Sequence, residues 1–185
     1  PGCLPTVWRN HQRLIDAYLV QHPGYYHTGD GGFLDEQGYL YIMGRTDDVI
    51  NVAGHRLSTG EMEEIVAAHA SVAECAVVGI ADNNKGQVPL GLLVLKDDNR
   101  ISSQVLQAAL IQAVRENIGA FANFRRAIVV DRLPKTRSGK ILRQIIRKIA
   151  NDEDFEHPAT IDDPVILEEI SDRFKAEKIG LVGEI

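Results

Sequence analysis

The chain has 185 residues, of which 44% are hydrophobic and 25% are charged, and its formal net charge at pH 7 is −6. This composition is typical of a folded globular protein and excludes a disordered chain or a collagen-like repeat. The apolar stretches are too short to span a membrane, and the acidic net charge argues against general nucleic-acid binding. Two cysteines, Cys3 and Cys75, are too few for a disulfide framework and favour a reducing, cytoplasmic location. The first residues, PGCLPTVWRN, have neither an initiator Met nor the pattern of a signal peptide, so we expect a cut edge of a longer protein.

The predicted elements of the first half are a short helix, two β-hairpins and the start of a second helix. Aromatic and aliphatic residues alternate with polar ones between glycine-bearing turns, as they do in hairpins. Ser58 with Glu61 three residues later has the spacing of a capping box, which predicts a helix start. The expected ranges are 12–20 for the short helix, 33–34 and 39–43 for the first hairpin, and 49–52 and 55–57 for the second.

The second half predicts two long strands, a helix, a strand and two further helices. Two apolar, β-branched runs flank the turn-rich segment ADNNKG, and apolar residues recur with helical spacing after Ser102 or Ser103. The expected ranges are 72–80 and 87–95 for the strands, 103–118 for the helix, 127–130 for the short strand, and 141–150 and 164–178 for the last helices. This order predicts an α+β fold in which helices flank a small sheet.

Charge is distributed unevenly along this second half. Residues 125–148 hold nine Lys and Arg against one Asp, whereas residues 149–185 hold three basic residues against 11 acidic ones. A dense positive segment in an acidic protein is typical of a site for an anionic ligand such as a phosphate. The alternative is a solvated basic helix that pairs with the acidic tail, and composition leaves both open.

Three glycine-bearing segments carry the candidate functional residues. In HTGDGG, at 27–32, Asp30 is held in a turn, where a carboxylate is suited to accept hydrogen bonds from a ribose diol. The alternative is a turn in which Asp30 bonds only its own backbone. The EF-hand ligand pattern is absent from this segment, which excludes calcium binding of that kind.

The second segment, GRTDDVINVAGHR, brackets a hairpin with two arginines. Arg45 and Arg56 suit phosphate and ribose contacts because a guanidinium is planar and always charged. Gly54 at the turn lets the backbone approach a ligand closely. The alternative is a surface hairpin in which Asp47 or Asp48 pairs with one of the arginines.

The third segment, LPKTRSGKILR, superficially resembles a phosphate-binding P-loop. Pro134 and Ile141 occupy the positions at which that motif requires Gly and Ser or Thr, so the P-loop interpretation fails. What remains is Lys140 on a glycine loop, able to insert a point charge into an anionic site. The alternative is a solvated lysine in a basic turn.

Together and in this order, YYHTGD, GRTDDVINVAGHRLSTGEMEE and LPKTRSGKILR resemble the C-terminal part of the acyl-adenylate-forming superfamily. Within it the chain is similar to short-chain acyl-CoA synthetases of the acetyl- or propionyl-CoA type, from about residue 25 to residue 150. The resemblance implies that residues 1–46 end a large N-terminal adenylating domain and that 47–150 form a mobile C-terminal lid. Residues 151–185 have no counterpart assigned from the family, and their composition predicts an acidic, partly helical tail. It also implies an enzyme that makes an acyl-AMP from ATP and a carboxylate and then a thioester with CoA.

The resemblance further implies roles for seven residues. They are Asp30 and Arg45 on the ribose of ATP, Asp47 as the hinge, Arg56 on a phosphate, Gly54 along the pantetheine tunnel, Arg115 on the CoA nucleotide, and Lys140 in adenylation. The family segments that hold ATP phosphates, Mg²⁺ and the acyl group are absent, so we expect an inactive fragment whose acyl specificity lies elsewhere. The six histidines do not fall at metal-ligand spacing, so no metal site is expected in this chain.

Two alternatives remain beside this interpretation. One is an adenylating ligase with another acyl chain or another acceptor, such as a carrier protein. The other is a stand-alone module whose basic segment binds an anion or an acidic partner.

Overall fold

The computed structural model describes residues 3–97 and 101–180. The contacts divide the chain into two compact units, Pro1–Asp47 and Asp48–Ile185. The division falls inside the short 3₁₀ turn η1 (Thr46–Asp48).

The first unit contains a helix and one β-hairpin. Asn10 caps helix α1 (His11–Tyr18) by accepting a hydrogen bond from the Arg13 N–H at 3.1 Å. Strands β1 (Asp30–Leu34) and β2 (Leu40–Arg45) pair antiparallel from Asp30↔Arg45 to Leu34↔Leu40. The predicted hairpin is confirmed, and both strands extend further toward the glycines than their apolar residues indicate.

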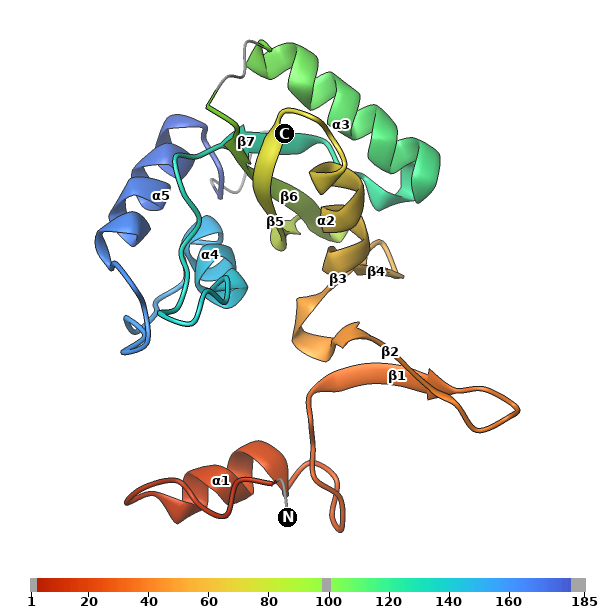
Figure 1. The fold of residues 1–185 in the computed structure, drawn as a ribbon, viewed down its shortest axis with the longest axis vertical. Helices are drawn as coiled ribbons and strands as arrows, with labels where there is room; N and C mark the ends of the chain where they lie inside the picture. The colour runs from red at the N-terminus through yellow and green to blue at the C-terminus, as the bar shows by residue number, and fades with distance from the viewer. Residues whose placement is uncertain (1–2, 98–100, 181–185) are drawn as a thin grey trace. The chain divides into compact units, whose positions relative to one another are not determined.

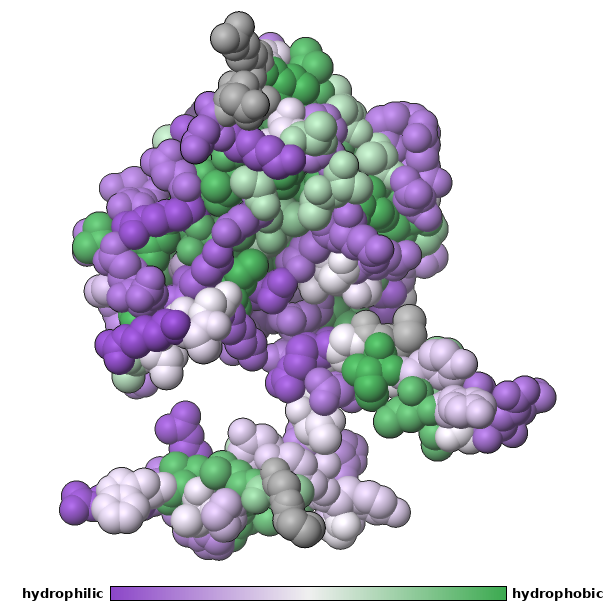
Figure 2. All heavy atoms as spheres, viewed as in Figure 1, coloured by the Kyte–Doolittle hydropathy of each residue, from purple (hydrophilic) through white to green (hydrophobic). Residues whose placement is uncertain are grey.

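This hairpin exposes its apolar side chains. Leu34, Leu40 and Ile42 are 67%, 64% and 59% exposed, and Figure 2 shows green side chains on the hairpin surface. Leu14 is the one buried hydrophobic side chain among the described residues of this unit. Contiguous exposed apolar surface of this kind typically marks an interaction or binding face.

The second unit is built on a five-stranded sheet in which β6 is central. Strand β6 (Gly86–Leu95) forms a long antiparallel hairpin with β5 (Val72–Asp82) and pairs parallel with β7 (Arg126–Val129). Near its start β6 also meets β3 (Val49–Val52), which pairs with β4 (His55–Ser58). The two hairpins expected here are confirmed.

Helices cover both faces of this sheet, as Figure 1 shows. Helices α2 (Thr59–Ala67) and α3 (Ser103–Asn117) pack on one face, and α4 (Arg143–Ala150) and α5 (Val165–Ala176) pack on the other. The sheet serves both layers because alternate residues of a strand point to opposite faces. Val78 faces α4 and α5, for example, while Val77 faces α2 and α3. The predicted α+β fold is confirmed.

Helices α2 and α3 begin directly after the serine caps that the sequence predicts. Ser58 accepts a hydrogen bond from the Glu61 N–H, and Ser102 accepts one from the Val105 N–H, both at 3.4 Å. Helix α4 begins at Arg143, two residues after the expected start, because Ile141 instead forms an isolated β-bridge with Lys135.

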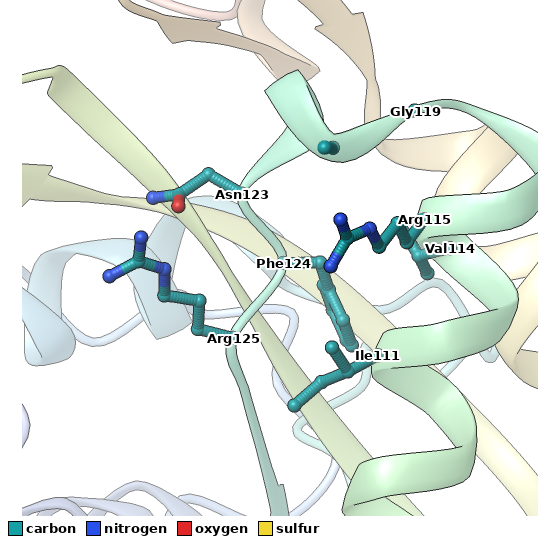
Figure 3. Close-up of a pocket in the computed structure, with 8 residues that line it drawn as sticks. Ile111, Val114, Arg115, Gly119, Asn123, Phe124 and Arg125 are labelled. Atoms are coloured by element: carbon teal, nitrogen blue, oxygen red, sulfur yellow. The ribbon is translucent and has the colours of Figure 1, made fainter.

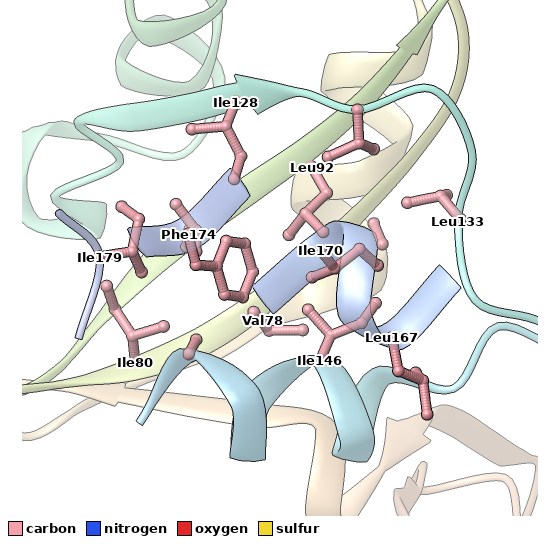
Figure 4. Packing of buried hydrophobic residues seen from close by; sticks show 14 of the residues in the cluster. Val78, Ile80, Leu92, Ile128, Leu133, Ile146, Leu167, Ile170, Phe174 and Ile179 are labelled. Atoms are coloured by element: carbon pink, nitrogen blue, oxygen red, sulfur yellow. The ribbon is translucent and has the colours of Figure 1, made fainter. Parts of the chain in front are cut away.

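Residues 151–180 belong to the second unit, which differs from the separate acidic tail expected from composition. Helix α5 buries Ile166, Leu167, Ile170 and Phe174 against the sheet, and Figure 4 shows Phe174 among the side chains of this core. These residues recur at helical spacing, so the acidic residues between them lie on the outer face of the helix. The acidic composition of this segment gave no sign of the apolar residues of α5 that attach it to the sheet.

Candidate functional site

The β1–β2 register brings Asp30 and Arg45 together. Nη1 of Arg45 lies 3.7 Å from Oδ1 of Asp30 and donates a 2.8 Å hydrogen bond to the Thr28 carbonyl. Gly29 is required there, because a Cβ at this position would lie 2.7 Å from the Arg45 guanidinium and its φ is +76°. A partly exposed carboxylate beside a guanidinium presents both acceptors and donors, which suits a diol.

Asp47 lies two residues beyond this pair, at the end of the first unit. Its Oδ1 accepts a 3.0 Å hydrogen bond from Nε of Arg45. The expected alternative, in which an aspartate pairs with Arg45, is therefore observed alongside the Asp30 contact. The structure places Asp47 in η1, where the two units meet in sequence.

In the second unit, Gly54 and Arg56 lie on the β3–β4 hairpin. Ala53 and Gly54 have φ values of +49° and +91°, and the Asn51 side chain accepts a 3.1 Å hydrogen bond from the Gly54 N–H. No heavy atom lies within 4 Å of the Cβ that another residue would have at Gly54, so open surface adjoins this backbone. Arg56 is exposed and forms no ion pair among the described residues.

Arg115 borders a pocket of about 230 Å³ at the end of α3. Figure 3 shows Arg115 and Phe124 on one side of the segment between η2 (Ala120–Ala122) and β7, and Asn123 and Arg125 on the other. The lining residues are Ile111, Val114, Arg115, Gly119, Ala120, Asn123, Phe124 and Arg125. Glu116 accepts a 2.6 Å hydrogen bond from Gln112, and the structure contains no Arg115–Glu116 ion pair within the described residues.

The Gly54 hairpin adjoins this pocket. The ring of His55, next to Gly54, lies 4.8 Å from the ring of Phe121 in η2. Gly119, which lines the pocket, holds φ at +127°, and a Cβ there would lie 2.5 Å from the Phe121 ring. The structure therefore brings Gly54 and Arg115 into one region of the second unit.

Lys140 lies on a closely hydrogen-bonded turn within residues 134–142, here called the lysine loop. Thr136 donates its N–H to the Lys140 carbonyl at 2.8 Å, and its Oγ1 accepts from the Lys140 N–H at 3.1 Å. Gly139, with φ at +84°, completes the turn. The Lys140 side chain is exposed, and its ammonium forms no ion pair within residues 3–97 and 101–180. The backbone is held while the charge stays available to an anion.

Arg143, three residues later, anchors this loop. Its Nε and Nη2 donate to the two carboxylate oxygens of Glu63 at 2.8 and 2.6 Å, and Glu63 also accepts from the Val77 N–H at 2.8 Å. The side chains of Glu63 and Arg143 are 14% and 25% exposed, and the bond to Glu63 raises the pKa of Arg143. Sequence analysis had counted Arg143 only as part of the basic segment.

Part of the basic segment pairs with acidic residues, as one of the two interpretations expects, and the interpretation as an anion site stays a prediction. Its members Arg126, Arg132, Lys135 and Arg143 form ion pairs with acidic side chains of the same unit. In contrast, Arg125, Arg137 and Lys140 form none within the described part of the chain. Arg125 is a pocket residue that sequence analysis missed, and its place in the basic segment was the only signal.

Two other kinds of reactive group bear on the chemistry of the described residues: the Cys75 thiol and clusters of potential metal ligands. Burial and the neighbouring Glu63 raise the pKa of the Cys75 thiol to about 11, which disfavours a nucleophilic thiolate. No group of three His, Cys, Asp or Glu side chains in the described ranges is placed to hold a metal ion. Among the same residues, no helix has the length and apolar character needed to cross a membrane.

Comparison with known proteins bears on the second unit directly. Residues 61–140 match the family model of the AMP-binding enzyme C-terminal domain. That segment runs from within α2 to Lys140, so it contains strands β5, β6 and β7, the Arg115 pocket and most of the lysine loop. This part of the chain belongs to the family of AMP-binding enzyme C-terminal domains.

Individual similar proteins indicate which kind of AMP-binding enzyme this chain resembles. The chain is 48% identical over 97% of its length to acyl-CoA synthetase short-chain family member B, mitochondrial, of Dictyostelium discoideum, and 64% identical over 97% to an uncharacterized protein of Pseudomonas aeruginosa. A solved structure of ATP-bound MatB from Rhodopseudomonas palustris matches 80% of the chain with a TM-score of 0.66 and 25% identity. The resemblance to short-chain acyl-CoA synthetases is confirmed. The chain spans only 26–29% of the length of these two relatives and 28% of the solved chain.

Proposed function

We propose that this chain is the C-terminal part of an ATP-dependent, AMP-forming short-chain carboxylate–CoA ligase. The observation that carries the proposal is Lys140, an exposed lysine whose ammonium forms no ion pair among the described residues. It lies on a hydrogen-bonded turn, in a segment that belongs to the AMP-binding enzyme C-terminal domains. Within the described residues, the same unit holds a second anion-binding feature, the pocket bordered by Arg115 and Arg125. One lid with two such features suits an enzyme with two half-reactions.

In the first half-reaction, the carboxylate attacks the α-phosphate of ATP and pyrophosphate leaves. Negative charge builds on both reacting groups, and the Lys140 ammonium stabilises it in the transition state. Asp30 accepts hydrogen bonds from the ribose hydroxyls, Arg45 donates to the ribose, and Arg56 contacts a phosphate. The Asp30–Arg45 contact of 3.7 Å holds the first two groups side by side for this role.

In the second half-reaction, the lid turns about Asp47 and presents the Gly54 hairpin to CoA. The thiol attacks the acyl-AMP carbonyl and AMP leaves. Gly54 lines the path of pantetheine, since its backbone adjoins open surface, and Arg115 contacts a phosphate of the CoA nucleotide.

The remaining parts of the enzyme are assigned to the large N-terminal domain. Mg²⁺ would be held there and would neutralise the charge of the ATP phosphates. The exposed apolar face of the β1–β2 hairpin supports a partner domain that covers it. The partners are thus ATP, a short-chain carboxylate, CoA and this domain, and we propose a cytoplasmic location from the two free cysteines.

The test is carboxylate-dependent ATP–pyrophosphate exchange by the enzyme that contains this chain. We expect exchange with acetate or propionate, and release of AMP on addition of CoA. The isolated 185-residue chain should fold and give no exchange, because positioning needs both halves of the nucleotide site. Exchange by the isolated chain, or its absence from the whole enzyme, would contradict the proposal.

The basic pocket favours CoA over a carrier protein as the acceptor. If Arg115 contacts a CoA phosphate, Arg115→Ala should raise the KM for CoA about 10- to 100-fold, since a charge-assisted bond contributes about 1.5–3 kcal/mol. The KM for ATP should stay unchanged. Arg125→Ala should raise the KM for CoA in the same direction, because Arg125 borders the same pocket.

Arg173→Ala, which removes an exposed guanidinium from α5, is the matched control for both variants. Steady-state kinetics with CoA as the varied substrate gives the KM values. An unchanged KM in the Arg115 variant would favour a purely structural role for this residue.

A further inference from the structure

The lysine loop is paired along its outer edge with a segment that follows the matched family domain. The Arg137 N–H donates to the Thr160 carbonyl at 3.0 Å, and the Asp162 N–H donates to the Lys135 carbonyl at 3.0 Å. Between these bonds, Thr136 and Ile161 form an antiparallel β-bridge. Residues 160–162 therefore act as a short extra strand beside the turn that carries the Lys140 side chain.

This strand is itself anchored in the core. Ile161 is 6% exposed and belongs to the same buried cluster as Ile170 and Phe174 of α5. Moving the strand away from the loop would expose this side chain or drag α5 with it. The hydrophobic core thus fixes the strand, and the strand fixes the loop.

A second link joins the chain just before the loop to the same segment. Arg132 donates from Nε and Nη2 to the carboxylate of Glu169 at 3.1 and 2.9 Å, and from Nη1 to Asp163 at 2.6 Å. The guanidinium thus holds α5 and the residue after the strand at the same time. Its bond to Asp163 lowers the pKa of that carboxyl, so the contact is ionic at neutral pH.

The inner side of the loop is attached independently. Lys135 lies 2.7 Å from Glu74 of β5, and Arg143 pairs with Glu63 of α2. Of the groups on this loop, Lys140 and Arg137 extend side chains without an ion pair in the described part of the chain. Because the lysine loop is bonded on both sides, its backbone holds Lys140 in one position.

We propose that residues 160–169, here called the clamp segment, position Lys140 for adenylation, and that Arg132 with Asp163 and Glu169 are positioning residues for that step. The inference rests on the proposed function and extends it beyond the matched domain, which ends at residue 140. A charge that stabilises a transition state acts at a fixed place, so freedom in the loop lowers the fraction of enzyme with the ammonium correctly placed.

The test is Arg132→Gln in the enzyme that contains this chain. We expect the rate of ATP–pyrophosphate exchange at saturating substrates to fall about three- to tenfold, since the loop is loosened and the ammonium itself is kept. The production of thioester from supplied acyl-AMP and CoA should stay within about twofold of the original rate, because Lys140 serves only the first transition state. Arg132→Lys, which keeps one ionic contact, should restore part of the exchange rate.

Two further measurements separate positioning from general stability. Asp163→Asn removes one arm of the Arg132 contact at an exposed site and should give a smaller loss of exchange with the same selectivity. Lys175→Gln breaks an exposed ion pair with Asp172 on the same helix and should leave both half-reactions unchanged. Hydrogen exchange at the Arg137 and Lys140 amides should become faster in the Arg132 variant.

The outcomes are distinct. If the original enzyme gives no carboxylate-dependent exchange, the proposed function fails. If that enzyme is active and Arg132→Gln and Asp163→Asn lower both half-reactions equally, or neither, the clamp segment is only a stability element and the inference is overturned. Selective loss of exchange, with partial rescue by Arg132→Lys, supports it.

Discussion

Replacing Lys140 with alanine is expected to lower ATP–pyrophosphate exchange about 10²- to 10³-fold, the usual cost of removing one group that stabilises transition-state charge. The Lys140 ammonium is exposed and the backbone of its turn is bonded through Thr136, so the substitution deletes the charge without dismantling the loop. Thioester formation from supplied acyl-AMP and CoA should remain close to the original rate, because the lysine is expected at the reaction centre only during adenylation.

The control for this experiment is Arg137→Ala. Arg137 is an exposed cation of the same loop, and its structural contact, the hydrogen bond to Thr160, comes from the backbone and survives the substitution. Its loss should leave exchange within a few-fold of the original rate, roughly the size of an exposed charge effect. If thioester formation falls as far as exchange in the Lys140 variant, the division of labour between the half-reactions is wrong.

The fold was largely predictable because local signals agree with the packing. Ser58 and Ser102 begin helices as caps do, and the continuous apolar runs of β5 and β6 match a sheet covered on both faces. The exceptions are places where a contact with a residue elsewhere in the chain determines the local structure. Helix α4 starts late because Ile141 pairs with Lys135, and residues 151–180 join the core because α5 finds a partner face across the sheet.

The candidate site, too, was predictable only in part from the sequence. Residue type and order identify Asp30, Arg45, Gly54, Arg56, Arg115 and Lys140 as candidates, and the structure adds that Asp30 contacts Arg45 and that the Gly54 hairpin adjoins the Arg115 pocket. No spacing rule separates the cations that bind a ligand from those that hold the fold. The partners of Arg132 and Arg143 lie 31 or more residues away in sequence, so only the packed structure shows that these charges are already used.

The second large effect is expected at Asp47, where proline should separate the half-reactions. Asp47 lies in the 3₁₀ turn η1, a conformation whose φ of about −50° to −70° is one that proline adopts. Proline then fixes that angle, so a lid orientation that requires another φ at this residue becomes inaccessible. We expect adenylation to survive and thioester formation to fall by at least about tenfold, as for a hinge that must turn between two steps.

Asp47→Ala is the matched control, because it removes the carboxylate that binds Arg45 at 3.0 Å and leaves φ unrestricted. If Asp47 is only a turn residue, the alanine and proline variants should behave alike, and pyrophosphate exchange and discharge of acyl-AMP should fall together or not at all. If Asp47 is the hinge, alanine should spare both steps while proline suppresses one. We expect the two variants to have similar thermal stability, because η1 is short and Asp47 is only partly buried. A thermal unfolding curve for each variant checks this. The step that survives in the proline variant then identifies the lid orientation that is built on the turn observed at residues 46–48.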